Sequence, residues 1–99
     1  MKKVTVKKSK VQSPIRVNNN VFIRTVTYHY TGKIEIVSKD TLVLSNAAWI
    51  ADSGRFATAM NSGVLNEVEP YPENTVVAIE RGAIVDISDW KFELPRIQK

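Results

Sequence analysis

The sequence predicts a mainly β fold: a small, strongly bent antiparallel barrel of about five strands, with one short helix inserted between strands 3 and 4. Residues 21–50 are rich in β-branched and aromatic side chains, and apolar residues recur there at every second position. Short clusters of turn-forming residues separate the apolar runs. A chain of 99 residues has room for one core, so we expect a single domain over residues 21–99, preceded by an arm and lead-in at residues 1–20.

The first predicted strands surround a glycine. Residues 11–20 contain a Pro and three consecutive Asn, which is turn chemistry leading into the first strand. Alternation over residues 28–36 predicts a strand with its two tyrosines on the buried face and His29 on the other, and a stacking surface formed by this Tyr-His-Tyr triplet is the other interpretation. Gly32 falls on the buried face, where a missing side chain permits a bend or a close strand crossing. After a short turn, residues 41–47 form the next predicted strand.

The middle of the chain predicts a short helix. Asp52 or Ser53 can cap a helix over about residues 55–61, and Gly63 can close it. The following residues, 64–75, are acidic and contain prolines, so we expect a connector without regular structure.

The last predicted strands form a hairpin. The apolar runs at residues 76–80 and 83–88 flank an Arg-Gly pair, and Gly82 can supply the positive φ of a tight turn. The tail that follows places Trp90 and Phe92 on one side of an extended segment, which we expect to dock on the body.

Positive charge is concentrated near the start of the chain. Residues 1–34 hold eight basic and no acidic residues, whereas residues 35–99 hold six basic and ten acidic ones. A basic arm on a mildly acidic body is typical of proteins that bind nucleic acid or another polyanion, and a solubilising tail is the other interpretation. The arm consists of Lys2, Lys3, Lys7, Lys8 and Lys10.

The composition gives no support for an enzyme, a cofactor or a metal site. One histidine and no cysteine make a transition-metal site unexpected, and no nucleophile–base pair or Gly-rich phosphate loop is evident. The absence of cysteine also fits a reducing compartment. No apolar run approaches the roughly 18 residues of a membrane span, and the N-terminus has no apolar signal region. We therefore expect a cytoplasmic protein with no membrane partner.

Two stretches, "TGKIEIVSKDTLVLSNA" and "IERGAIVDI", resemble the two-part signature of the Sm-like proteins. In that family a strand with a central Gly leads through a turn into a strand of Asn-Leu-Val-Leu type, and a later turn carries Arg-Gly between aliphatics. The stretch "AAWIADSGRF" is similar to small uncharacterised phage proteins, which would make the chain a divergent, phage-type member. The matching residues are Gly32, Ile34, Leu42, Val43, Leu44, Asn46, Ala47, Ile79, Arg81, Gly82 and Val85.

The resemblance implies assembly with further copies of the same chain. Sm-like proteins are five-stranded bent barrels that form closed rings, here of about five to seven subunits, in which the fourth strand of one subunit pairs with the fifth strand of the next. Such pairing would cover the strand edges that an incompletely closed sheet leaves open. The expected interface residues are Val76, Val77, Ile79, Ile84, Val85 and Ile87.

The resemblance also implies a site for single-stranded RNA. In RNA-binding members two turns face the ring lumen, and Arg81 and Gly82 match the second of them. The first turn reads Lys39, Asp40 and Thr41, where the family has an aromatic or His and an Asn that bind bases. Phosphate contact by Lys39 and Arg81 is therefore expected rather than base stacking. The other interpretation of Arg81 is an exposed turn residue paired with Glu80 or Asp86.

Two functions remain open from the sequence. The first is a ring-forming Sm-like protein that binds single-stranded RNA, without catalysis, through a basic lumen and the N-terminal arm. The second is a phage structural or adaptor ring that binds protein and has lost RNA binding.

Overall fold

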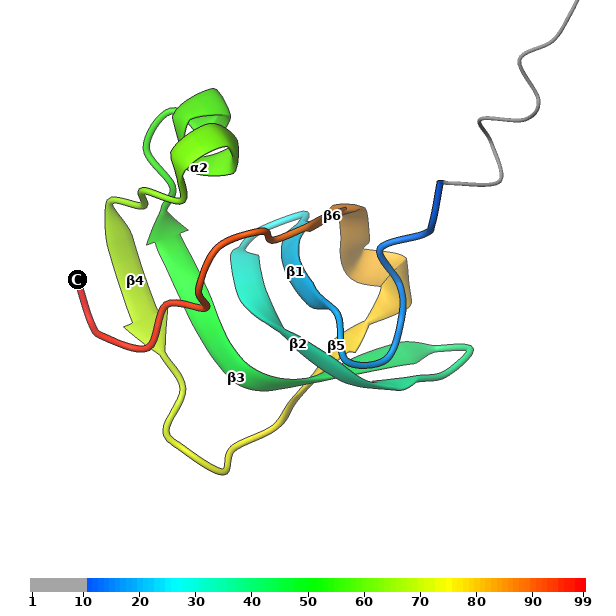
Figure 1. Ribbon diagram of the computed structural model, residues 1–99. Helices are drawn as coiled ribbons and strands as arrows, with labels where there is room; N and C mark the ends of the chain where they lie inside the picture. The colour runs from blue at the N-terminus through cyan, green and yellow to red at the C-terminus, as the bar shows by residue number, and fades with distance from the viewer. Residues whose placement is uncertain (1–10) are drawn as a thin grey trace, which may run out of the picture.

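The computed structural model describes residues 11–99, which form one six-stranded antiparallel sheet with a short helix, α2 (Phe56–Ser62), between β3 and β4 (Figure 1). A 3-10 helix, η1 (Arg81–Ala83), connects β5 to β6. No helix among these residues is long and apolar enough to cross a membrane. The strands are β1 (Asn20–Thr25), β2 (His29–Val37), β3 (Thr41–Asp52), β4 (Glu67–Pro70), β5 (Val77–Glu80) and β6 (Ile84–Asp89).

The sheet is organised around the long strand β3, which curves strongly (Figure 1). The strands lie in the order β4-β3-β2-β1-β6, and β5 pairs with β3 outside this path. Residues 41–44 of β3 pair with β5, whereas residues 48–52 pair with β4. One strand of twelve residues therefore carries two short strands in succession along the same edge.

The predicted mainly β class and short helix are confirmed, but the strand count and the last hairpin are wrong. The strand β4 lies within the residues expected to be an unstructured connector, because its sequence, EVEP, offers only one buried apolar side chain, Val68. The strands β5 and β6 do not pair with each other: β5 pairs with β3, and β6 pairs with β1. The helix η1 carries the chain from one edge of the sheet to the other.

Gly82 does not supply a positive φ, contrary to the sequence prediction. The positive-φ glycines among the described residues are Gly54 and Gly63. Gly82 lies in η1, and a Cβ built on it would meet no atom within 4 Å. The bend between β5 and β6 is therefore made by a turn of 3-10 helix, which requires no left-handed residue.

Gly32 has the role that the sequence predicted. A Cβ at this position would lie 3.0 Å from Cδ1 and 3.1 Å from Cβ of Leu44 on the neighbouring strand, and 3.4 Å from Cα of Ala47. The β2–β3 register shifts between Thr31 and Lys33, directly around this close approach. The missing side chain allows Leu44 and Ala47 of β3 to lie close to the β2 backbone where the register shifts.

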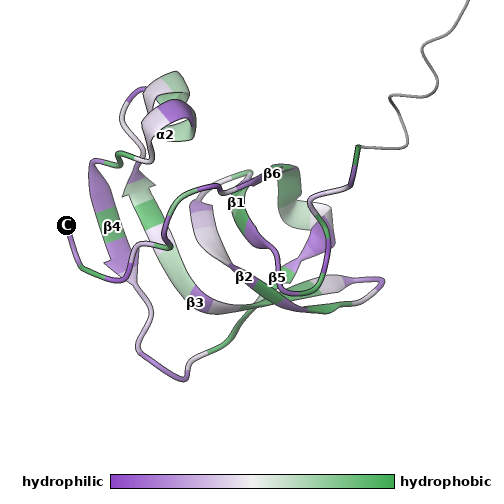
Figure 2. Cartoon of the chain, viewed as in Figure 1, coloured by the Kyte–Doolittle hydropathy of each residue, from purple (hydrophilic) through white to green (hydrophobic). Residues whose placement is uncertain are grey.

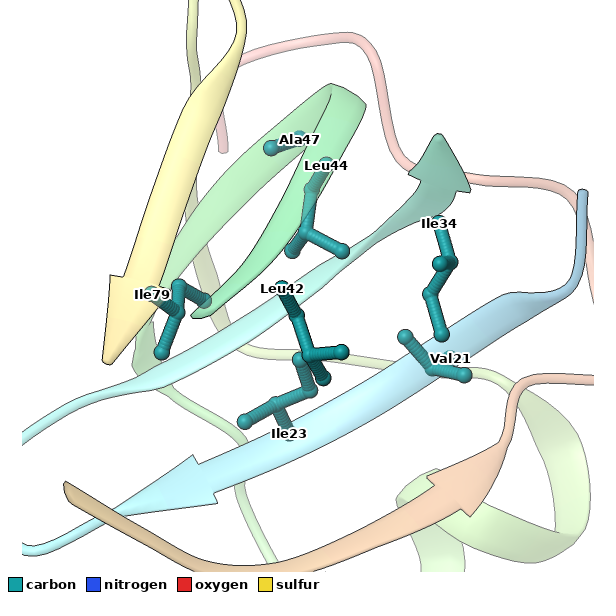
Figure 3. Close-up of a cluster of buried hydrophobic side chains, with 7 residues drawn as sticks. All are labelled: Val21, Ile23, Ile34, Leu42, Leu44, Ala47 and Ile79. Atoms are coloured by element: carbon teal, nitrogen blue, oxygen red, sulfur yellow. The ribbon is translucent and has the colours of Figure 1, made fainter. Parts of the chain in front are cut away.

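The first of two hydrophobic clusters lies on one face of β1, β2 and β3 (Figure 3). It takes Val21 and Ile23 from β1, residues that share a face because side chains alternate along a strand. Partly buried side chains from β5, β6 and the neighbouring loops pack around it. The buried members are Val21, Ile23, Ile34, Leu42, Leu44, Ala47 and Ile79.

The second cluster covers the opposite face, because Phe22 points away from its neighbours in β1. Its cover comes from α2, which contributes Ala59, and from the tail after β6, which contributes Trp90. The rings of Phe22 and Trp90 stack with centroids 5.7 Å apart. Docking of the tail through Trp90 and Phe92 is thus confirmed.

This second layer overturns the predicted burial of the residues around His29. The His29 ring packs beside Phe22, with centroids 5.8 Å apart, so this face of β2 is not a free surface. Tyr28, expected in the core, is 50% exposed, whereas Tyr30 is partly buried and packs against the first cluster, on the expected face. The prediction assumed one covered face, whereas the helix and tail cover the other face as well.

The helix itself begins later than its predicted cap. Arg55 occupies the N-cap position without a side-chain hydrogen bond, whereas Asp52 accepts a hydrogen bond from the N–H of Gly54 in the preceding turn. Gly63 closes the helix as expected: its φ is 76°, and its N–H donates to the carbonyl of Ala59. The expected closure by a left-handed glycine is confirmed.

The C-terminal end of the chain lies against β4, a strand of hydrophilic residues on either side of one hydrophobic residue, the buried Val68 (Figure 2). The main-chain N–H and C=O of Lys99 both bond to Val68, at 3.0 and 3.1 Å. The guanidinium of Arg96 donates to the carbonyls of Ala47 and Tyr71, both at 2.8 Å. The tail thus covers the outer edge of β4 and fixes the start of the loop that follows it.

Candidate nucleic-acid interface

The structure places the two predicted RNA-contacting turns side by side. Thr41 at the start of β3 pairs with Glu80 at the end of β5, so the β2–β3 turn meets η1. The main-chain N–H of Arg81 donates to the carbonyl of Asp40 at 2.8 Å. Its guanidinium Nη1 donates to the carbonyl of Ser38, also at 2.8 Å. Two segments forty residues apart therefore form one continuous surface.

Arg81 forms no ion pair with either acidic neighbour. The ion pairs within residues 11–99 join Arg16 to Asp89 and Arg24 to Asp86, so Asp86 is occupied by another arginine. The hydrogen bond from Arg81 to Ser38 is exposed and uses one guanidinium nitrogen. The remaining N–H groups keep the full positive charge available to a partner.

The β2–β3 turn is closed by its own hydrogen bonds. The N–H and hydroxyl of Ser38 both donate to the Thr41 carbonyl at 3.0 Å, and the Thr41 N–H donates back to the Ser38 hydroxyl at 3.1 Å. The two hydroxyls lie 2.9 Å apart. Thr41 is therefore engaged within the turn, whereas Lys39 and Asp40 are exposed at its tip.

The predicted interface residues divide into buried and exposed groups. Ile79 is 6% exposed and belongs to the first cluster, so it has little surface left for another subunit. Val77, Ile84 and Ile87 are partly buried against the same cluster. Val76 and Val85 are each 62% exposed. The lysines of the N-terminal arm, Lys2, Lys3, Lys7, Lys8 and Lys10, lie outside the described residues.

An aromatic hollow of about 320 Å³ lies near the opposite end of β2, where the sequence predicted core tyrosines and a connector. The aromatic and proline residues that line it stand in two short stretches, "YHY" and "EPYP", but the first was assigned to the core and the second to a connector. The lining residues come from the turn before β2, from β2, β3 and β4, and from the loop after β4: Tyr28, Tyr30, Trp49, Glu69, Pro70, Tyr71 and Pro72.

The walls of this hollow follow from the strand register. Tyr30 and Trp49 are direct partners across β2 and β3, which places their side chains on one face. Tyr28 meets Trp49 edge to face, with centroids 5.3 Å apart. Burial raises the pKa of the Tyr30 hydroxyl, and the nearby phenols of Tyr71 and Tyr28 raise it further. Three phenols therefore converge around one indole.

Comparison of the chain with models of known protein families, with curated proteins and with solved structures gives no match. Residues 11–99 contain no group of three or more His, Cys, Asp or Glu side chains placed to hold a metal ion.

Proposed function

We propose that the protein binds single-stranded RNA without catalysis, at the surface formed by the β2–β3 turn and η1. The observation that carries the proposal is the pair of hydrogen bonds from Arg81 to the carbonyls of Asp40 and Ser38. They hold the Arg81 guanidinium on the β2–β3 turn that also carries the exposed Lys39, so one surface carries two cationic residues. Adjacent cations without bulky neighbours are suited to a phosphate backbone.

The chemistry of this surface favours phosphate over base contacts. The turn offers no aromatic ring for stacking, and the Thr41 hydroxyl already lies within hydrogen-bonding distance of Ser38. The Asp40 carboxylate at the tip of the turn repels a phosphate, which offsets part of the attraction from Lys39 and Arg81. Binding should therefore be weak per subunit, sensitive to salt and nearly independent of base sequence.

We further propose that the sheet is an Sm-like bent barrel and that several copies form a ring, so that these surfaces repeat around a lumen. In support, β5 has only β3 as a partner and β6 only β1 within residues 11–99, which leaves one edge of each open. Exposed Ile36 and Val76 line, with Val43 and five polar residues, a hollow of about 510 Å³ between β2, β3 and the segment that leads into β5. Exposed apolar surface next to an open strand edge is typical of a subunit contact.

Fluorescence anisotropy with a labelled oligouridylate of about ten nucleotides tests RNA binding, with salt varied from low to physiological concentration. Lys39→Gln should weaken binding and reduce the log–log salt slope by about 0.7, the value for one lost phosphate contact on a single strand. Asp40→Asn should strengthen binding, because it removes the opposing charge. Lys91→Gln, on the exposed tail, is the matched control and should change neither the affinity nor the slope beyond a general charge effect.

An oligoadenylate should behave as the oligouridylate does, because phosphate contacts carry no base information. No binding at low salt, or equal effects of Lys39→Gln and Lys91→Gln, would contradict the proposal. A ring that binds protein is the second candidate, and the engagement of Thr41 within its own turn favours it, because a base-binding group is then missing.

A further inference from the structure

We propose that the aromatic hollow formed by Tyr28, Tyr30, Trp49 and the loop after β4 binds a proline-rich peptide in the polyproline II conformation, carrying a basic residue next to its prolines. This site lies near the start of β2, whereas the proposed RNA surface lies beyond its end. The inference is therefore independent of the proposed function.

The shape and composition of the hollow fit such a peptide. Aromatic rings from two neighbouring strands form one wall, and Pro70, Tyr71 and Pro72 form the other. Polyproline II peptides bind in aromatic-lined grooves, because their flat pyrrolidine rings pack on aromatic faces at a small cost in conformational entropy. A volume of about 320 Å³ is at the small end for ligand sites and is suited to a few side chains rather than to a large cofactor.

The polar groups around the hollow can serve a peptide that brings acceptors. The phenol hydroxyls of Tyr28, Tyr30 and Tyr71 can each donate one hydrogen bond, and Trp49, whose ring lines the hollow, has a buried indole N–H without an acceptor within residues 11–99. A proline-rich peptide supplies solvated carbonyl oxygens and lacks N–H groups at its prolines, so it can accept from these phenols.

The charge beside the hollow selects a basic peptide over a nucleic acid. Glu69 is part of the lining, and Glu67 and Glu73 lie in the same short segment of chain. The Arg96 guanidinium keeps its charge, but its Nη1 and Nη2 both donate to main-chain carbonyls, those of Ala47 and Tyr71, and Arg96 is not among the residues that line the hollow. A phosphate would meet carboxylates here, whereas an Arg or Lys beside the prolines would pair with Glu69.

The loop wall is already in place before any ligand binds. The N–H of Tyr71 donates to the carbonyl of Ala47 at 2.9 Å, and Arg96 bonds to the Tyr71 carbonyl. Fixed prolines on either side restrict the backbone further. A preformed wall reduces the entropy lost on binding, which allows a small site to hold a peptide.

A nuclear magnetic resonance titration of the full chain with a peptide of about nine prolines followed by one arginine tests the inference. The indole N–H signal of Trp49 should shift on binding. The signal of Trp90 should not, because its indole already donates to the carbonyl of Glu93 at 3.0 Å. Trp49→Phe assigns the two signals. Tyr28→Ala should weaken binding about tenfold, and since Tyr28 is half-exposed the fold should tolerate the change.

Three comparisons keep the test specific. Glu69→Gln should weaken binding of the arginine-bearing peptide about threefold and leave binding of an all-proline peptide unchanged. Ile36→Ala and Lys39→Gln, away from the hollow, should leave peptide binding unchanged. No indole shift at about 1 mM peptide, or equal binding of an alanine-rich peptide with the same arginine, would overturn the inference. Displacement of the peptide by an oligonucleotide would also overturn it and would assign the hollow to nucleobases.

Discussion

Arg24 of β1 and Asp86 of β6 are register partners, and the Arg24 guanidinium holds the Asp86 carboxylate through both Nε and Nη2. The other side of the guanidinium faces helix α2, with its Cζ 4.6 Å from the centroid of the Phe56 ring. One arginine therefore connects β1, β6 and α2. It also occupies the Asp86 carboxylate that the sequence offered to Arg81, and Arg81 forms no ion pair within residues 11–99.

This pair predicts a dependence of stability on pH. Hydrogen bonds from Arg24 lower the pKa of Asp86 against the opposing effect of burial, and the charges of Arg24 and His29 lower it further. The unfolded-state pKa is about 3.9, so the contribution is present above that value and is lost as the pH falls through the lower folded-state pKa. Asp86→Asn should lower the Tm at about pH 7, and the difference in Tm between this variant and wild type should be smaller near pH 2. Thermal unfolding followed by circular dichroism measures both differences.

The effect should be small, because the two side chains are 36% and 42% exposed. Glu73→Gln is the control for the loss of one charge, since this residue is exposed and outside the pair, and its Tm at neutral pH should stay close to wild type. Equal losses of Tm at both pH values would show that the asparagine acts through something other than the ion pair.

Local signals in the sequence were sufficient for most elements of the fold. Alternation identified β2, the left-handed Gly63 marked the end of α2, and Gly32 marked the close approach of β3 to β2. The strand β4 was missed because it is short and polar on one face, and it depends on β3 and on the C-terminal residue for its pairing. Strands formed by tertiary contacts leave a weak local signal.

The sequence was less informative about the sites. Neighbouring strands in a chain commonly pair, so β5 and β6 were expected to form a hairpin, whereas β5 joins β3. That pairing is what brings Arg81 to the β2–β3 turn. The aromatic hollow was missed because tyrosines in an alternating strand were assigned to the core, and the cover on the opposite face by α2 and the tail had no local signal.

Gly63 and Gly82 should respond differently to substitution by alanine, because only Gly63 has a positive φ and a crowded Cβ position. Gly63 has a φ of 76°, and a Cβ there would lie 2.6 Å from Cγ of Phe92. Gly63→Ala should lower the free energy of unfolding by about 2–4 kcal/mol, from left-handed strain and displacement of the Phe92 ring. Gly82→Ala should change it by no more than about 0.5 kcal/mol, because η1 has space for a methyl group. Urea denaturation of both variants measures the contrast, and similar losses for the two would contradict it.

The last prediction concerns assembly through the open edges of β5 and β6. Val76 precedes β5 and Val85 lies in β6, and both are 62% exposed, so a charge at either position should be tolerated by the isolated chain. In a ring the same positions would be buried between subunits, where an unpaired ammonium is costly. Val76→Lys or Val85→Lys should therefore convert the assembly to monomers, whereas Val64→Lys, 52% exposed and outside both edges, should leave it intact.

Light scattering after size-exclusion chromatography measures the mass, with unchanged circular dichroism showing that each variant folds. A monomeric wild type at micromolar concentration would contradict the ring. RNA would then contact the β2–β3 turn and η1 of one subunit only, and the affinity for RNA would not depend on self-association of the protein.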